Sequence, residues 1–185
     1  MSSRSARAAL RAARPYREVR ATFREGDLLA FRGRSPVSAV IRAVTGSVYS
    51  HVGLVYLIEE RRYCLEAVGK GVSLGLMSEV AKRYAGGIDY FAIDAPDAVR
   101  HAATLFALEQ LGKPFDFVGL VRFFLLLSLR IRSRARADQR WFCAELVAAA
   151  YRRQGIELAR TPACYSAPRD LARSARARFV YTFKP

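Results

Sequence analysis

The sequence predicts an α+β domain, in which strands gather in the middle of the chain and helices lie before and after them. Apolar runs rich in β-branched residues follow one another between residues 51 and 93, separated by short polar or glycine-containing turns. This grouping favours α+β over an alternating βαβ arrangement, and the sequence contains no internal repeat. With 185 residues, one domain with its own hydrophobic core is expected.

A short strand and a helix are expected first. Asp27 to Phe31 is a short apolar strand after a glycine. A helix is expected over Pro36 to Val44. Ser35 supplies an N-cap, proline suits the first helical position, and Gly46 ends the helix.

The central part of the chain is expected to form a hairpin and two further strands. His51 to Ile58 is a buried strand, and Arg62 to Val68 returns after a polar turn. Further strands are expected around Val72 to Leu76 and over Ile88 to Ile93.

The second half of the chain is expected to be mostly helical. The expected elements are a helix over 96–111, an apolar helix capped by Asp116, a basic loop over 130–140, a helix over 141–154 closed by Gly155, a short helix from Pro168 to about Ser174, and a last strand over 179–183.

The chain is strongly basic, with a formal net charge of +15 carried mostly by arginine. Residues 1–24 are interpreted as a basic arm, helical or disordered, that lies outside the core of a domain spanning 25–185. The charge favours an acidic polymer or an anionic membrane as a partner, contacted through this basic arm, and the alternative is an arginine-rich composition with solvated charges. Nucleic acid is disfavoured as a partner, because no nucleic-acid-binding motif occurs.

Cysteine usage and the chain start bear on cofactors and location. Cys64, Cys143 and Cys164 have irregular spacings and form no CxxC pair, which disfavours a zinc site and a disulfide framework. No cofactor is expected, and a reducing compartment fits best. Residues 1–20 lack the apolar region of a secretory signal, so we expect a cytoplasmic protein, with a virion or tail location as the alternative. The apolar run from Phe115 to Ile131 is too short for a bilayer span and is interpreted as a buried helix.

Three residues form a candidate thiol-nucleophile set. Cys143 begins a helix, where the first N–H groups favour an anionic thiolate. His51 is a candidate base, and the hairpin turn places Glu66 across from it as the group that orients the imidazole. Cys64 is expected to face the opposite side of the strand as core filler, and His101 to lie at the surface.

Each of the three residues also has a purely structural interpretation. A single cysteine at a helix start is usually a small core residue, and a single histidine in a strand is usually structural. Glu66 is harder to explain in this way, because a buried carboxylate is costly without a partner. Together the three residues favour a functional site.

Five segments in this order resemble a known family, the circularly permuted NlpC-type papain-like amidases of the YiiX/YebB-like group. The segments are Gly26–Leu29, Tyr49–Gly53, Leu65–Ala67, Gly112–Phe117 and Phe142–Val147. The resemblance covers roughly residues 25–175. Ordinary NlpC-type peptidases place the cysteine helix before the histidine strand, whereas the permuted group places it last, as in this chain.

The resemblance implies a papain-like fold with an antiparallel, barrel-like sheet packed on the cysteine helix. It implies Cys143 as nucleophile, His51 as base and Glu66 as the orienting group. It also suggests that Tyr49 helps the backbone N–H of Cys143 stabilise the oxyanion.

Three classes of function remain open at this point. The first is a cysteine amidase or peptidase that cleaves an amide in a short peptide or a peptidoglycan-type substrate through an acyl-enzyme. The second is a lipid acyltransferase or thioesterase of the lecithin:retinol acyltransferase-like type, suggested by the apolar run over 117–129. The third is a non-catalytic, phage-tail-associated binding or assembly component, suggested by the basic arm.

Overall fold

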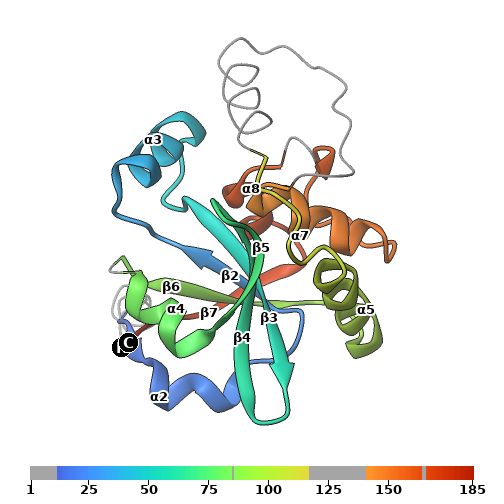
Figure 1. Ribbon diagram of the computed structural model, residues 1–185, viewed down its shortest axis with the longest axis horizontal. Helices are drawn as coiled ribbons and strands as arrows, with labels where there is room; N and C mark the ends of the chain where they lie inside the picture. Colours follow the sequence, from blue (N-terminus) through green and yellow to red (C-terminus); the bar gives the residue numbers. More distant parts are fainter. Residues whose placement is uncertain (1–11, 85, 117–140, 164–165) are drawn as a thin grey trace, which may run out of the picture.

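The computed structural model describes residues 12–84, 86–116, 141–163 and 166–185, which form an open seven-stranded sheet with helices on both faces (Figure 1). The strand order is β1-β7-β6-β2-β3-β4-β5. The strands are β1 (Arg14–Pro15), β2 (Leu28–Phe31), β3 (His51–Ile58), β4 (Arg61–Val68), β5 (Gly71–Leu76), β6 (Ile88–Ile93) and β7 (Ala177–Lys184). Only the β1–β7 pair is parallel. The α+β class is therefore confirmed, but the expected barrel-like closure is not seen, because β1 and β5 are edge strands.

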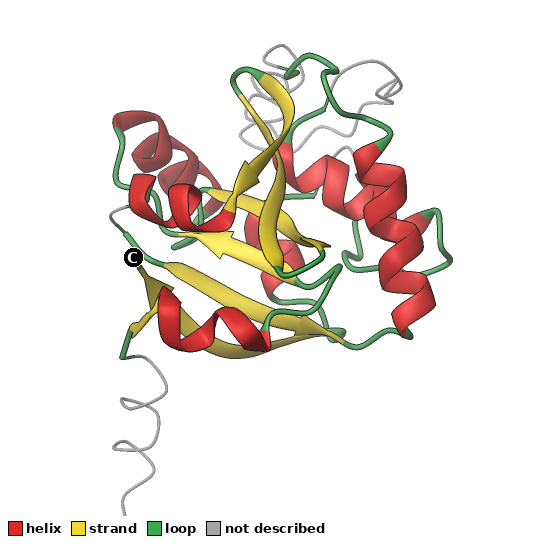
Figure 2. Cartoon of the chain, turned by 60° about the horizontal axis from the view of Figure 1, so that its bottom comes forward, coloured by secondary structure: helices red, strands yellow, loops and turns green. Residues whose placement is uncertain are grey.

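Helices cover the two faces of the sheet (Figure 2). The helical elements are α2 (Tyr16–Val19), a 3₁₀ turn η1 (Arg20–Thr22), α3 (Pro36–Thr45), α4 (Met77–Arg83), α5 (Asp97–Leu108), α7 (Cys143–Arg152) and α8 (Pro168–Ala172). One face packs against α5, α7 and α8, and the other packs against α2 and α4. Within the described residues, no helix is long and apolar enough to cross a membrane. Of the apolar run from 115 to 131, the structure describes only residues 115 and 116, so the helix that Asp116 was expected to cap and the loop over 130–140 lie outside the described residues.

Strand β2 lies near the centre of the sheet and divides the two cores. Leu28 and Ala30 point into the core under α7, whereas Leu29 and Phe31 point into the core under α4. This alternation follows from the two-residue period of a strand. Because all four side chains are buried, β2 reads as a continuous apolar run in the sequence.

Several elements begin and end where the sequence predicts. The expected bounds of β3 and β6 are those observed. In α3, the Ser35 hydroxyl accepts a hydrogen bond from the Ser38 N–H, and Gly46 ends the helix with a left-handed φ of 58°. Glycine is favoured there because it adopts positive φ without steric cost.

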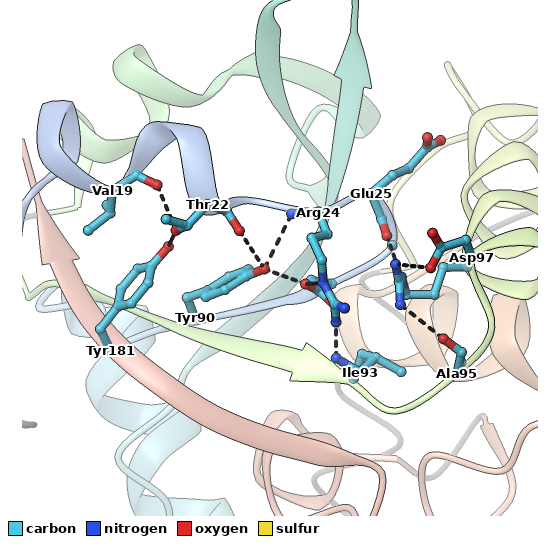
Figure 3. Close-up of polar contacts among 12 residues, drawn as sticks. Val19, Thr22, Arg24, Glu25, Tyr90, Ile93, Ala95, Asp97 and Tyr181 are labelled. Carbon is cyan, nitrogen blue, oxygen red and sulfur yellow. Dashed lines mark hydrogen bonds and ion pairs between the residues drawn. The ribbon is translucent and has the colours of Figure 1, made fainter.

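The segment expected to form an arm outside the core is partly built into the fold. Val19 and Phe23 are 0% and 3% exposed in the core that α4 also covers. Figure 3 shows how neighbouring residues attach, with the Thr22 hydroxyl 2.6 Å from that of Tyr181 and the Arg24 N–H donating to the Tyr90 hydroxyl. The prediction of an arm outside the core was wrong for residues 14–24. The many arginines in this part of the sequence outweighed the signal from two buried apolar residues. Residues 1–11 lie outside the described part.

Two further details differ from expectation. Helix α4 was not expected, because it is short and follows a glycine-containing strand, although Met77, Val80 and Ala81 have helical spacing and are buried. Cys64 is core filler, but it faces the same side of β4 as Glu66, because residues two apart in a strand share a face.

Candidate active site

Helix α7 places Cys143 at its first position, over the sheet. The preceding Trp141 is fixed by two backbone hydrogen bonds, one that its N–H donates to Pro114 and one that its carbonyl accepts from Asp116. Glu145, one turn into the helix, accepts a hydrogen bond from the Phe142 N–H. This contact is half of a capping box, in which the third helical residue reaches back to the N–H of the N-cap residue; the apolar Phe142 side chain makes no cap hydrogen bond in return. Cys143 is 8% exposed.

The hairpin β3–β4 brings His51 and Glu66 together. Their Nε2 and Oε2 atoms are 2.7 Å apart, and both side chains are buried. The strand register pairs Leu54 with Leu65, and its continuation places Glu66 opposite Gly53. His51 is therefore the diagonal neighbour of Glu66 on the same face. A Cβ at position 53 would lie 3.3 Å from the Cβ of Glu66, so glycine keeps this face open.

Cys143 and His51 meet across the interface between helix and sheet. Burial lowers the pKa of His51, but the charge of a Cys143 thiolate and a hydrogen bond to it, joined by those of Glu66, raise that pKa to about 10. The structure thus brings together the three residues that the sequence singled out: a thiol, an imidazole and a carboxylate in a chain of contacts.

Two residues of this site were missed by sequence reasoning, and both lie at the end of α4. The ring of Tyr84 lies parallel to that of His51 at a centroid distance of 6.1 Å. The Arg83 Nη2 atom is 3.5 Å from Glu66 Oε1, while its side chain is 62% exposed. Glu66 therefore has a partner on each oxygen. The helical spacing of Met77, Val80 and Ala81 was the one signal for α4.

A pocket of about 300 Å³ opens beside Cys143 and His51. Its walls come from α3, β4 and the segments that precede α7 and α8. The lining is largely apolar, from Val37, Ile41, Ala67, Val68, Phe115 and Phe142. Three serines, Ser38, Ser50 and Ser166, add hydroxyl groups. An apolar group next to a carbonyl fits this pocket better than a charged group does.

The structure does not bring Tyr49 to this pocket. Its hydroxyl donates to Asp89 Oδ2 at 2.7 Å, in a separate cleft on the other side of α3. Burial, followed by the interaction with Asp89, raises the pKa of Tyr49. His101 lies at the surface, as expected, with its Nδ1 atom 3.1 Å from Glu25. Cys164 lies outside the described residues.

The described residues hold no group of three or more His, Cys, Asp or Glu side chains placed to bind a metal ion. What they do hold is a set suited to thiol chemistry. A thiol at a helix start is near partial positive charge, an imidazole can accept and return its proton, and a buried carboxylate can hold the imidazole in place.

Comparison with known proteins places this geometry in context. The family model described as the permuted papain-like amidase enzyme, YaeF/YiiX, C92 family, matches residues 22–166. The crystal structure of the metalloprotein YiiX from Escherichia coli O157:H7 superimposes with a TM-score of 0.70 at 19% identity, covering 88% of this chain and 98% of that one. At this identity the likeness shows a shared fold. No curated protein matches the chain significantly.

Proposed function

The chain belongs to the permuted papain-like amidase family, and from this premise we propose that it hydrolyses an amide through Cys143, His51 and Glu66. The family supports an amidase or peptidase type of function. The observation that carries the residue assignment is the chain of contacts from the buried carboxylate to the imidazole and on to the thiol. The substrate we propose is an amide in a short peptide or a peptidoglycan-type molecule.

In the first half-reaction, the Cys143 sulfur attacks the carbonyl carbon and a C–S bond forms. The carbonyl oxygen becomes an oxyanion, which the backbone N–H of Cys143 at the start of α7 stabilises in this proposal. His51 then gives a proton to the leaving nitrogen, the C–N bond breaks, and an acyl-enzyme remains. Glu66 holds the imidazole and stabilises its positive charge.

In the second half-reaction, His51 takes a proton from water, whose oxygen attacks the thioester carbon. The C–S bond breaks, the carboxylic acid leaves, and the thiol site is restored. The largely apolar pocket beside Cys143 accommodates the group attached to the carbonyl.

Labelling with a fluorescent iodoacetamide, combined with peptide-amide hydrolysis, tests the assignment. We expect Cys143→Ala to abolish hydrolysis and to remove the label found at position 143, and His51→Ala to reduce hydrolysis at least about 10³-fold. His101→Ala is the matched control, because His101 is the second of the two histidines and lies exposed at the surface. The assignment is wrong if Cys143→Ala retains hydrolysis, or if His51→Ala behaves like the control.

A second function, hydrolysis or transfer of a lipid acyl group, is favoured by the apolar lining of the pocket. The same thiol would form an acyl-enzyme from an ester or thioester. Para-nitrophenyl esters of increasing chain length distinguish the two functions. If kcat/KM rises steeply with chain length and exceeds that for peptide amides, the lipid function is correct. If it stays flat, the pocket is not an acyl site.

A further inference from the structure

A second cleft, of about 740 Å³, lies on the other side of α3 from the pocket of Cys143. Four arginines line it from separate parts of the chain: Arg32 follows β2, Arg42 is on α3, and Arg169 and Arg173 are on and just after α8. Because they are far apart in sequence, only the fold gathers them. We call this site the arginine cleft.

The arginine cleft holds more positive than negative charge. Asp89 is its one acidic lining residue, and it is 1% exposed. That carboxylate already accepts hydrogen bonds from Arg32, from the Tyr49 hydroxyl and from the Thr182 hydroxyl. The Asp89 carboxylate therefore neutralises Arg32 and can accept few further hydrogen bonds from the other three arginines.

The remaining arginines have few acidic partners. Arg42 reaches the Ser38 carbonyl at 3.4 Å, and Arg169 contacts the Thr45 carbonyl and, at 3.4 Å, the carboxylate of Asp170. Arg173 is exposed and has no side-chain partner among the described residues. Three guanidinium groups around one cleft, with one acidic partner between them, favour an anion that carries several oxygens and more than one charge.

The floor of the arginine cleft is aromatic. Phe91 and Phe179 pack edge to face with ring centroids 5.7 Å apart, and the ring of Tyr49 lies edge to face with Phe91 at 6.0 Å. Val48, which is 58% exposed, adds apolar surface at the rim. A ligand with an apolar part beside its anionic group matches both features better than a bare inorganic ion.

The two sites share their walls. Helix α3 presents Ile41 and Thr45 to the pocket of Cys143, and Arg42 to the arginine cleft. In the same way, Pro168 faces the pocket, whereas Arg169 faces the cleft. We propose that the arginine cleft binds a phosphate group carried by the molecule whose acyl part enters the pocket of Cys143. The link to the substrate rests on the proposed function, whereas the phosphate site does not.

The phosphate site is tested by binding measurements on the Cys143→Ala protein, in which turnover plays no part. Isothermal titration with inorganic phosphate at constant ionic strength is compared between this protein and one that also carries Arg42→Gln and Arg173→Gln. We expect the two glutamines to weaken phosphate binding at least about ten-fold, because each removes a charge-assisted hydrogen bond. Acetate, a monocarboxylate, is expected to bind more weakly than phosphate.

The matched control replaces Arg17 and Arg61 by glutamine, which removes the same two charges. Both are exposed, and they lie on α2 and at the β3–β4 turn, at the opposite end of the molecule from α3 in Figure 1. If both double variants weaken phosphate binding equally, the effect is one of overall charge and the proposal is overturned. Absence of phosphate binding, or acetate binding as tight as phosphate, also overturns it.

The link to the substrate is tested with dihexanoyl phosphatidic acid below its micellar concentration. Tighter binding of this lipid than of inorganic phosphate, lost in the Arg42→Gln/Arg173→Gln protein, supports a phosphate carried on an acyl compound. Equal binding of the two probes overturns the link and leaves a site for free phosphate. If phosphate binds as expected but no ester or amide is turned over by wild-type protein, the proposed function fails while the phosphate site stands.

Discussion

Among single residues, Glu66 connects the candidate base His51 to two neighbours outside the catalytic set. Its two oxygens face His51 and Arg83, and the thiol of Cys64 also interacts with it. Burial, followed by the charge of Glu66, raises the pKa of Cys64 well above its ordinary value, so this thiol is an unreactive neighbour. The same carboxylate thus stabilises the charged form of an imidazole and disfavours the charged form of a thiol.

We predict that Glu66→Gln lowers the pKa of His51 from about 10 toward its ordinary value of 6.5, because a negative charge is lost. The raised pKa means that protonated His51 stabilises the folded state fully below pH 6.5, and that this stability is lost as the pH rises through about 10. Between pH 6.5 and about 10, the variant should therefore lose less stability than wild type. NMR titration of the imidazole, together with urea unfolding at several pH values, measures both effects. An unchanged titration would contradict the role given to Glu66.

Glu145 leads to a second prediction at this scale. Burial raises its pKa to about 7, although the hydrogen bond from the Phe142 N–H acts in the opposite direction. Folded protein therefore holds this proton more tightly than unfolded protein, and stability falls as the pH rises from about 4.5 to above 7. We expect Glu145→Gln to be stabilising at pH 8 relative to wild type, on the order of 1–3 kcal/mol, and nearly neutral at pH 4. Thermal unfolding at the two pH values tests this, and a pH-independent difference would contradict it.

Among the elements, the β3–β4 hairpin determines the geometry of the site, and Gly53 is its most constrained position. A Cβ there would lie 2.7 Å from Cys64 Sγ and 3.1 Å from the Leu65 carbonyl oxygen. We predict that Gly53→Ala costs about 1–3 kcal/mol of stability by overpacking and also reduces turnover by displacing Glu66. Chemical unfolding and steady-state kinetics measure the two effects.

Gly112→Ala is the control for this experiment. A Cβ at Gly112 meets no atom within 4 Å, but φ is +78°. The substitution therefore lowers stability only through backbone strain, by about 1 kcal/mol. Gly112 also lies outside the hairpin. Equal losses of turnover in the two variants would show that the hairpin face has no special role.

The elements also show what a sequence can predict. Strands β3 and β6 are β-rich apolar runs with clear ends, so local pattern is sufficient. Helix α4 has only seven residues and no side-chain cap, so its formation depends on the core against which Met77 packs. His51, Glu66 and Cys143 were selected by residue type and chain order. Tyr84 and Arg83 join them through tertiary packing, which no local pattern indicates.

For the whole molecule, the segment before β2 is structural. The Phe23 ring packs edge to face against Tyr90 and Phe183, at 5.0 Å and 5.2 Å between centroids. We predict that Phe23→Ala costs about 3–5 kcal/mol, as for other buried phenylalanines, because it leaves a cavity between α2 and the sheet. Urea unfolding gives the value, and Arg17→Ala, an exposed residue on the same segment, should change it by less than about 0.5 kcal/mol. A small loss for Phe23→Ala would restore the interpretation of this segment as an arm.

The arginine cleft illustrates the limit of sequence reasoning at this scale. The net charge of +15 is evident from composition, and we expected its effect to be concentrated in the N-terminal segment. Arg32, Arg42, Arg169 and Arg173 are spread over most of the chain and share no motif. Their convergence depends on the way α3 and α8 pack beside the sheet.

The order of the candidate catalytic residues along the chain has a consequence for synthesis on the ribosome. The strands that carry His51 and Glu66 are translated about 80 residues before α7, so the sheet part of the site emerges first. In the site we propose, the thiol is the last component to appear, and it meets an imidazole only when α7 packs on the hairpin. A nascent chain of this protein therefore carries no activated nucleophile until most of its fold has been made.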